Sequence, residues 1–367
     1  MHNSPTGEDG FLPRDPSTSF SILDPGSYGQ SALTHELGHS LGLAHGGEYN
    51  ATDDNDGDGE PDPITYEGDA YFFQDSHQYT IMSYFEGEVT GAGWVDWRTL
   101  TFRMPSTPMV HDILAVQALY GAETTTRTGD TVYGFNSNAG NPIYDFTSNT
   151  APVLTIWDAG GNDTLDLSGW DSDSLININE GAFSSASAGA SLDYLKSIGF
   201  LPEDYTQAEL ETFFASYNSG SQGQMTDNIA ISYGAQIENA IGGGGDDEII
   251  GNALDNRLLG NDGDDNLIGG IGNDFLVGGD GTDVFSLGAG DDIIVAQVTD
   301  SKVGLKGPNK GDMSVDIVVD FNADGDDSID LTGFDQMFTF GGTDANKDAG
   351  DLTFKTFDSV AGAENAL

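Results

Sequence analysis

The chain has 367 residues, of which 61 are acidic and 11 are Lys or Arg, so its formal net charge is −50. This charge repels nucleic acid and anionic membranes, and neither is expected as a partner. A hydrophobic fraction of 37%, with 20 Phe and 13 Tyr, argues against disorder. The chain has no cysteine, which excludes disulfides and Cys-ligated zinc. No apolar run approaches the roughly 20 residues that span a bilayer.

The first 121 residues are predicted to hold two helices. The opening segment, residues 1–26, is polar and reads as loop. Leu33, Leu37 and Leu41 recur at helical spacing, which predicts a helix over residues 30–44 that stops at Gly46–Gly47. A second helix is expected over residues 109–120, ended by Gly121. Its inward face is predicted to carry Ile113, Val116, Ala118 and Leu119.

After Gly121 the sequence changes to short strand-like runs separated by Gly, Asn and Asp, so a domain boundary is expected near residue 122. Residues 1–121 would form one domain and residues 122–367 the other. A helical insert is predicted over residues 191–218, where Thr206 and Glu209 form a capping box. Its buried face would then be formed by Leu210, Phe213, Phe214 and Tyr217.

An internal repeat predicts the second fold. From Gly242 to Val295 the chain runs in six gapless blocks of nine residues. The sixth position is Asp in five blocks and Asn256 in the second, and the eighth position is always apolar. A stack of such turns buries the apolar residue, and it also brings many carboxylates together, which repel unless a cation lies between them. The spacing therefore predicts a parallel β-roll with calcium at nearly every turn. The alternative, a flexible Gly-Asp linker, does not explain the constant phase.

The stretch "HELGHSLGLAH", residues 35–45, carries the clearest chemistry. On a helix, His35 and His39 share one face and can reach the same metal. Gly42 lets the chain turn so that His45 returns as a third ligand. Three imidazoles leave one coordination position of a single catalytic Zn²⁺ open for water, and Glu36 is predicted to take the proton of that water as general base. The other histidines, His2, His77 and His111, are read as surface or supporting residues.

These residues resemble the zinc helix of the metzincin proteases. "TIMSY", residues 80–84, is similar to their Met-turn, with Met82 beneath the metal. Tyr84 matches a tyrosine of the serralysin branch that ligates zinc or stabilises the oxyanion. "RTGDTVYGFNSN", "WDAGGNDTLDLSG" and "IENAIGG" are also similar to serralysins. The resemblance implies an α+β catalytic part of metzincin type, truncated, followed by an all-β parallel β-roll or β-sandwich with RTX nonapeptide repeats.

The resemblance also implies calcium ligands. Backbone oxygens of Arg127, Gly129 and Thr131 would join Asp158, Gly160 and Asp163 in one site, and Gly161, Asp163, Gln236 and Glu238 would form the next. In the roll, positions two, four and six would contribute: Gly243, Gly245, Asp247, Asn252, Leu254, Asn256, Asn261, Gly263, Asp265, Gly270, Gly272, Asp274, Gly279, Gly281, Asp283, Gly288, Gly290 and Asp292. The second block should contribute least, since Asn256 brings no charge.

The function implied is a secreted, extracellular zinc endopeptidase, exported without an N-terminal signal peptide, monomeric, acting on protein and peptide substrates and open to a proteinaceous inhibitor. The alternative is a non-catalytic calcium-binding RTX adhesin or matrix protein with an inert protease remnant. Only 34 residues precede His35, so the sheet that holds substrate in serralysins is expected to be missing and proteolysis weak. For Asp54–Asp62, a calcium loop and a solvated acidic loop remain equal alternatives.

Overall fold

A computed structural model describes residues 23–49, 62–295, 317–318 and 327–330. Its helices are α1 (Tyr28–Ser40), α2 (Tyr66–Asp69), α3 (Val110–Tyr120), α4 (Leu192–Ser197) and α5 (Gln207–Ala215), with 3₁₀ turns at Gly87–Thr90 and Pro142–Tyr144. Among these residues no helix combines the length and the apolar character needed to cross a membrane. His2, Asp54, Asp56 and Asp58 lie outside the described residues, so the acidic-loop alternatives stay open.

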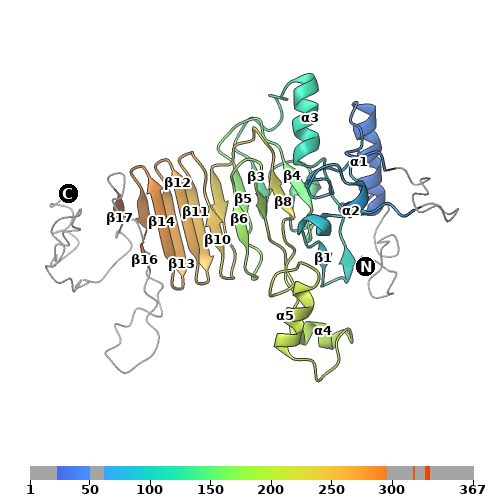
Figure 1. Ribbon diagram of the computed structural model, residues 1–367. Coiled ribbons are helices and arrows are strands. Elements are labelled where there is room, and N and C mark those ends of the chain that lie inside the picture. The colour runs from blue at the N-terminus through green and yellow to red at the C-terminus, as the bar shows by residue number, and fades with distance from the viewer. Residues whose placement is uncertain (1–22, 50–61, 296–316, 319–326, 331–367) are drawn as a thin grey trace, which may run out of the picture.

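The roll consists of two long parallel sheets, and strands that follow one another along the repeat belong alternately to one sheet and to the other (Figure 1). One has the order β16-β14-β12-β10-β6 and the other β17-β15-β13-β11-β9-β5-β3. Their bounds are β3 (Val132–Gly134), β5 (Thr164–Asp166), β6 (Leu175–Asn177), β9 (Asn239–Ile241), β10 (Glu248–Ile250), β11 (Arg257–Asp262), β12 (Asn266–Ile271), β13 (Phe275–Asp280), β14 (Val284–Ala289), β15 (Ile293–Val295), β16 (Ile317–Val318) and β17 (Ser328–Asp330).

Smaller sheets flank this stack. One has the order β4-β8-β7, formed by β4 (Leu154–Ile156), β8 (Ile229–Ile231) and β7 (Phe183–Ser184), and a hairpin pairs β1 (Val95–Asp96) with β2 (Thr101–Phe102). Figure 1 shows α1 and α3 near one end of the stack, with α4 and α5 projecting from its side. Before residue 122 the described residues form α1, α2, α3, the turn Gly87–Thr90 and the hairpin, joined by loops. A metzincin-like fold of this part and the boundary near 122 remain predictions.

The nine-residue phase produces the two sheets because consecutive blocks fall on opposite sheets. Each residue therefore pairs with the one 18 positions later, as Leu258 does with Leu276 and Leu267 with Phe285. The eighth-position side chains are all buried, at 0–4% exposure: Ile249, Leu258, Leu267, Leu276, Phe285 and Ile294. Each burial contributes about 1.5–3 kcal/mol, so the repeat forms its own core. The predicted β-roll is confirmed.

Helix α1 ends earlier than predicted, at Ser40. Gly42 takes a left-handed φ of +92°, its N–H donates to the His39 carbonyl, and the Leu43 N–H donates to the Gly38 carbonyl. This pair of bonds is a Schellman motif, which ends a helix without any help from the later Gly46–Gly47. The prediction that the helix continued to residue 44 was therefore wrong.

The apolar residues of α1 and α3 do not all face inward. Leu33, Leu37 and Leu41 are 46–54% exposed on α1. On α3, Leu119 is 59% exposed, and Ala118 is also exposed, so the inward placement predicted for these two was wrong. The predicted C-terminal stop is confirmed, since the Gly121 N–H donates to the Gln117 carbonyl.

A second core joins the β1–β2 hairpin to the helical insert. Trp97 contacts the rings of Phe213, Phe214 and Tyr217, and its indole N–H donates to Ser219 Oγ at 2.9 Å. The predicted insert and its capping box are confirmed: the Thr206 side chain accepts from the Glu209 N–H, and the Glu209 carboxylate accepts from the Thr206 N–H at 2.8 Å. Residues on both sides of position 122 thus share this core.

Candidate functional site

The three histidines of "HELGHSLGLAH" converge. Helix α1 carries His35 and His39 one turn apart, and the reversal at Gly42 brings His45 back toward them. His35 Nε2 lies 3.1 Å from His45 Nε2, and His39 Nε2 lies 3.0 Å from the same atom. The ligand atoms offered by the three residues all lie within 4.8 Å of one another. Three imidazole nitrogens gathered in this way suit Zn²⁺, which prefers nitrogen and sulfur ligands.

The outer ring nitrogens fix the protonation of two of these imidazoles. His35 Nδ1 lies 2.7 Å from the Ile81 carbonyl oxygen, and His39 Nδ1 lies 2.9 Å from that of Leu43. A carbonyl only accepts, so in the neutral imidazole Nδ1 carries the proton and Nε2 presents a lone pair. A hydrogen on His45 Nε2 could bond to only one of the two lone pairs that face it, whereas a cation among the three Nε2 atoms could bind all three. The arrangement therefore fits a bound metal ion.

The pKa of His45 is lowered from its usual value. Burial is the largest cause, followed by the charges of His39 and His35, while the nearby Glu36 carboxylate acts in the opposite direction. A lowered pKa keeps the imidazole neutral near pH 7, which is the form that binds a metal. Glu36 itself is exposed on α1, beside the cluster.

Met82 lies directly under helix α1, at Gly38. It is 2% exposed, and its Sδ lies 2.5 Å from the place where a Cβ on Gly38 would stand. The turn is held by Asp112, whose carboxylate accepts from Thr80 Oγ1 at 2.6 Å and from the Ile81 N–H at 2.8 Å. Glycine at position 38 is therefore what lets α1 rest directly on this methionine.

Asp112 is a supporting residue that the sequence analysis missed. It also accepts from the Met109 N–H at 2.8 Å, and so ties the start of α3 to the Met-turn. Burial raises the pKa of Asp112, and the hydrogen bonds from Thr80, Ile81 and Met109 oppose that rise. An acidic residue in the first turn of a helix is an ordinary start signal. Nothing in the sequence indicated that Asp112 also accepts hydrogen bonds from Thr80 and Ile81.

Tyr84 lies beside the histidines. Its ring centroid is 4.6 Å from that of His45 and 6.1 Å from that of His35, and its side chain is 51% exposed. Tyr49 stacks on it at 4.7 Å and donates its hydroxyl hydrogen to the buried Asp75. Tyr49 and Asp75 were not predicted, because no spacing rule links them to the zinc motif. The Tyr84 ring therefore lies next to the histidine cluster.

His77 and His111 stand apart from the three-histidine cluster. Burial lowers the pKa of His77 to about 4, and the pKa of His111 is also lowered by burial. The His111 ring lies 5.4 Å from that of Tyr79. Both side chains are partly buried, so they belong to the packing of this end of the molecule.

The first predicted calcium sites bring acidic groups together at Asp163. Its Oδ1 accepts from the Thr131 N–H at 2.7 Å, while its Oδ2 is buried with no hydrogen-bond partner. Its own N–H donates to the Glu238 carboxylate at 2.7 Å. Burial, together with the nearby Asp158 and Glu238 carboxylates, raises the pKa of Asp163 to about 7. A buried oxygen among like charges is what a calcium ion would neutralise.

The other residues predicted for these two calcium sites lie in the turns around Asp163. Asp158 accepts from the Tyr133 hydroxyl at 2.5 Å, and the Gly129 carbonyl lies 2.6 Å from a Cβ built on Gly161. Arg127 directs its guanidinium to the Trp157 carbonyl and over the Tyr144 ring, which leaves only its backbone oxygen for a cation. Gly160 lies in the same turn with a positive φ, and Gln236 is exposed on the turn that carries Glu238.

In the roll the sixth-position acids form what we call the carboxylate ladder. Each carboxylate accepts from the backbone N–H of the sixth-position residue 18 positions earlier: Asp265 from Asp247, Asp283 from Asp265, Asp274 from Asn256 and Asp292 from Asp274, at 2.8–3.0 Å. The Oδ2 atoms of Asp265 and Asp274 are buried without a partner. Burial raises the pKa of Asp265 to about 8 and that of Asp274 to about 6.

Backbone carbonyls line the same turns. At the second position, Gly279 and Gly288 each lie over the carbonyl of the residue 18 positions earlier, Asn261 and Gly270. At the fourth position, Gly263, Gly281 and Gly290 lie in the same way over the carbonyls of Gly245, Gly263 and Gly272. Asp247 differs, because both its oxygens accept from backbone N–H groups, those of Ser174 and Gly243. The predicted roll ligands thus fall into two stacked rows of oxygen atoms.

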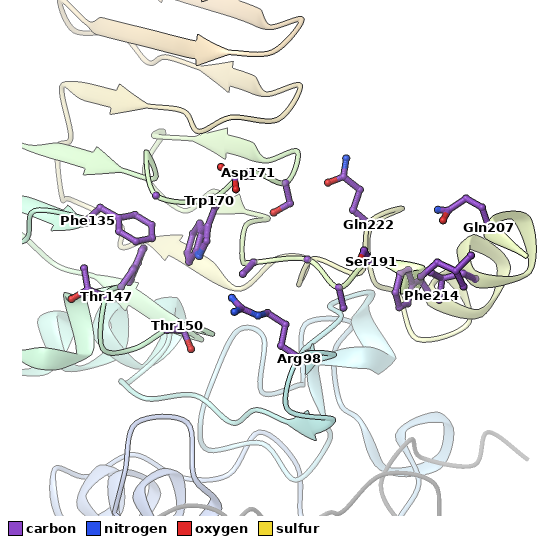
Figure 2. A pocket seen from close by; sticks show the side chains of 18 residues that line it. Arg98, Phe135, Thr147, Thr150, Trp170, Asp171, Ser191, Gln207, Phe214 and Gln222 are labelled. Carbon is purple, nitrogen blue, oxygen red and sulfur yellow. The ribbon is translucent and has the colours of Figure 1, made fainter. Parts of the chain in front are cut away.

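A cavity lined by described residues lies away from the histidine cluster and the predicted calcium sites. It has a volume of about 650 Å³ and lies between the roll and the helical insert. Figure 2 shows Arg98 pointing into it, with Trp170 and Asp171 on the side of the roll and Phe214 on the side of the insert. None of the residues predicted to bind metal or act in catalysis lines it.

Two family models match regions of the chain after residue 121. Residues 122–191 match the family model described as Peptidase M10 serralysin C terminal. Residues 234–265, 241–276 and 259–294 match the RTX calcium-binding nonapeptide repeat. The repeats are therefore of a calcium-binding type.

Relatives extend the likeness. The chain is 41% identical to Serralysin C of Dickeya chrysanthemi over 233 residues, which is 63% of this chain and 38% of the relative. It is 38% identical to Metalloprotease AprA of Pseudomonas entomophila over 251 residues, 68% of this chain and 42% of the relative. The chain thus spans about two fifths of the length of the relatives it matches. Together these matches support a serralysin-family protein, as the sequence motifs indicated.

Proposed function

We propose that this chain belongs to a secreted, zinc-dependent endopeptidase of serralysin type that hydrolyses extracellular proteins. The observation that carries the proposal is the convergence of the Nε2 atoms of His35, His39 and His45, with the first two rings anchored through Nδ1. The family matches and the names of the relatives, Serralysin C and Metalloprotease AprA, support the same reaction class.

The residues divide the chemistry between them. The three histidines hold one Zn²⁺, which supplies Lewis-acid chemistry by acidifying water and polarising a carbonyl group. The carboxylate of Glu36, exposed beside His45, accepts the proton of the attacking water and returns it to the leaving amine. The Tyr84 hydroxyl, beside His45, donates a hydrogen bond to the oxyanion. Met82 packs under α1, and Asp112 holds the Met-turn against the start of α3, so both keep the histidines in place.

Calcium has a structural role in this proposal. Asp163, Asp265 and Asp274 each have a buried Oδ2 atom without a partner, and in the absence of a cation each is repelled by other carboxylates on neighbouring turns. Extracellular calcium modules bind at about 10⁻⁴ to 10⁻³ M, so the roll folds outside the cell and not in the cytosol. Export without a classical signal peptide and a monomeric state belong to the same proposal. Circular dichroism during a calcium titration tests it, and a strand signal unchanged by exhaustive chelation would refute it.

The zinc mechanism is tested with Glu36→Gln, His39→Ala and a matched control, Glu67→Gln on α2. Zinc content is measured by mass spectrometry and cleavage by a fluorogenic peptide. Glu36→Gln should keep the zinc and lose cleavage, because only the base is removed, while His39→Ala should lose both. The control should retain both. Full cleavage by Glu36→Gln would refute the role of Glu36 as the base. If the unmodified chain contained no zinc, the alternative function, a non-catalytic RTX protein, would be favoured.

A further inference from the structure

The turn that carries Asn256 departs from the hydrogen-bonding pattern of the carboxylate ladder: there the sixth-position side chain donates to the neighbouring turn instead of accepting from it. On the side of the roll that carries turn 251–256, the Thr131 N–H donates to Asp163 and the Asp163 N–H donates to Glu238. Beyond this turn, the Asn256 N–H donates to Asp274 at 2.8 Å. Between Glu238 and Asn256 the side chain is the donor instead: Asn256 Nδ2 donates to the Glu238 carbonyl oxygen at 3.0 Å.

The partners of Asn256 fix which end of its carboxamide faces Glu238. Its Oδ1 accepts from the Asn252 N–H at 2.7 Å, and a backbone N–H can only donate. The second hydrogen of Nδ2 goes to Asn252 Oδ1 at 3.0 Å. The amide group therefore presents its NH₂ group, and no lone pair, to the turn that carries Glu238. A calcium ion there would meet positive hydrogen atoms where it needs oxygen atoms.

Asn252 completes this arrangement. Its amide donates to the carbonyl oxygens of Ile178 at 3.2 Å and Ile237 at 2.8 Å. Its Oδ1 also accepts from the Leu254 N–H at 3.0 Å. The Asn252–Asn256 pair thus uses all four of its amide hydrogens on acceptors, and it links turn 251–256 to both long sheets. By contrast, Asp163 and Asp274 on either side each keep one buried oxygen without a partner.

The backbone of this turn also differs from that of the four blocks after it. In those blocks the second and fourth positions all have positive φ: Asn261, Gly263, Gly270, Gly272, Gly279, Gly281, Gly288 and Gly290. Neither Asn252 nor Leu254 does. The first block shares this backbone but keeps the carboxylate of Asp247. Only the second block lacks both the repeated turn conformation and the acid.

We propose that the Asn256 carboxamide takes the place of a calcium ion between the turn that carries Glu238 and turn 251–256. The inference rests on the proposed calcium binding of the roll and refines it. The repeat pattern predicts Asn256 as a weak ligand, and here it is a hydrogen-bond donor that closes the step without a metal. The stack then holds cations at Asp163 on one side and at Asp274 on the other, with a neutral step between them.

Crystals of the unmodified chain grown with calcium chloride test this directly. Anomalous difference density should mark cations beside Asp163 and Asp274, with no peak between the Glu238 carbonyl and Asn256. A peak at that position would overturn the proposal. A chain that binds no calcium anywhere would instead refute the proposed function of the roll, so the two failures are distinguishable.

Reciprocal variants give a second test in solution, with bound calcium counted by native mass spectrometry. Asn256→Asp replaces the amide hydrogens by an oxygen and a charge, and should bind one more calcium than the unmodified chain. Asp274→Asn makes the opposite change one turn later and should bind fewer. An unchanged count in Asn256→Asp, alongside a loss in Asp274→Asn, would contradict the claim that the amide is what excludes the cation.

Discussion

Replacing Asp112 by Ala should damage the histidine cluster without touching a ligand. Asp112 is 3% exposed, and its two oxygens accept from the Thr80 hydroxyl and from the N–H groups of Ile81 and Met109. The Ile81 carbonyl in turn receives the His35 Nδ1 hydrogen at 2.7 Å. Removing the carboxylate frees the Met-turn to move, and His35 moves with it.

The magnitude follows from the donors left behind. Two backbone N–H groups lose their acceptor, and each costs about 1–3 kcal/mol when buried without a partner. The Thr80 hydroxyl can rotate to another acceptor and is left out. The expected loss of stability is therefore about 2–6 kcal/mol. Since supporting residues typically contribute 10- to 100-fold to metal affinity, zinc binding should weaken by about that factor.

Asp112→Asn is the matched control. Its single carbonyl oxygen can accept from both N–H groups, and its NH₂ can donate to Thr80 Oγ1, so the loss should be only about 1 kcal/mol. Unfolding would be followed by tryptophan fluorescence at saturating calcium, and zinc affinity by competition with a chromophoric chelator. The reasoning fails if Asp112→Ala binds zinc as tightly as the unmodified chain, or if Asp112→Asn is as damaged as Asp112→Ala.

Three further outcomes are expected. Burial lowers the pKa of His77 to about 4, against about 6.5 in the unfolded chain, so protonation of His77 favours unfolding. The free energy of unfolding should therefore fall by up to about 3 kcal/mol from pH 6.5 to pH 4. In His77→Gln the melting temperature should lose this dependence on pH. Gly281→Ala, whose Cβ would lie 1.8 Å from the Gly263 carbonyl oxygen at φ +151°, should cost at least about 3 kcal/mol by thermal unfolding. In its control, Gly140→Ala, the new Cβ also has a positive φ but meets nothing within 4 Å, so the cost should be only about 1–2 kcal/mol. Thr206→Ala removes the N-cap of α5 and should cost about 1 kcal/mol, seen as faster amide exchange over residues 207–215.

Local rules in the sequence were enough to predict the roll. A residue that is apolar once in every nine positions can be buried only by stacking turns, and the glycines let each turn close. Ile249, Leu267 and Phe285 are buried as that phase requires. The same kind of rule placed His35 and His39 on one helical face, because a spacing of four residues is close to one turn. The capping box at Thr206 was readable for the same reason, since both its partners lie within one turn.

The tertiary structure alone decided what holds those elements together. Asp112 reaches Ile81 across 31 positions, and Met82 lies under Gly38 across 44, so neither contact has a spacing rule. The repeat phase placed Asn256 on a turn of the roll, but it did not indicate the hydrogen bond from the Asn256 side chain to the Glu238 carbonyl oxygen. That direction depends on which donors and acceptors the packed backbones present to each other. A sequence specifies the groups available for hydrogen bonding, whereas their pairing is settled only when distant segments pack.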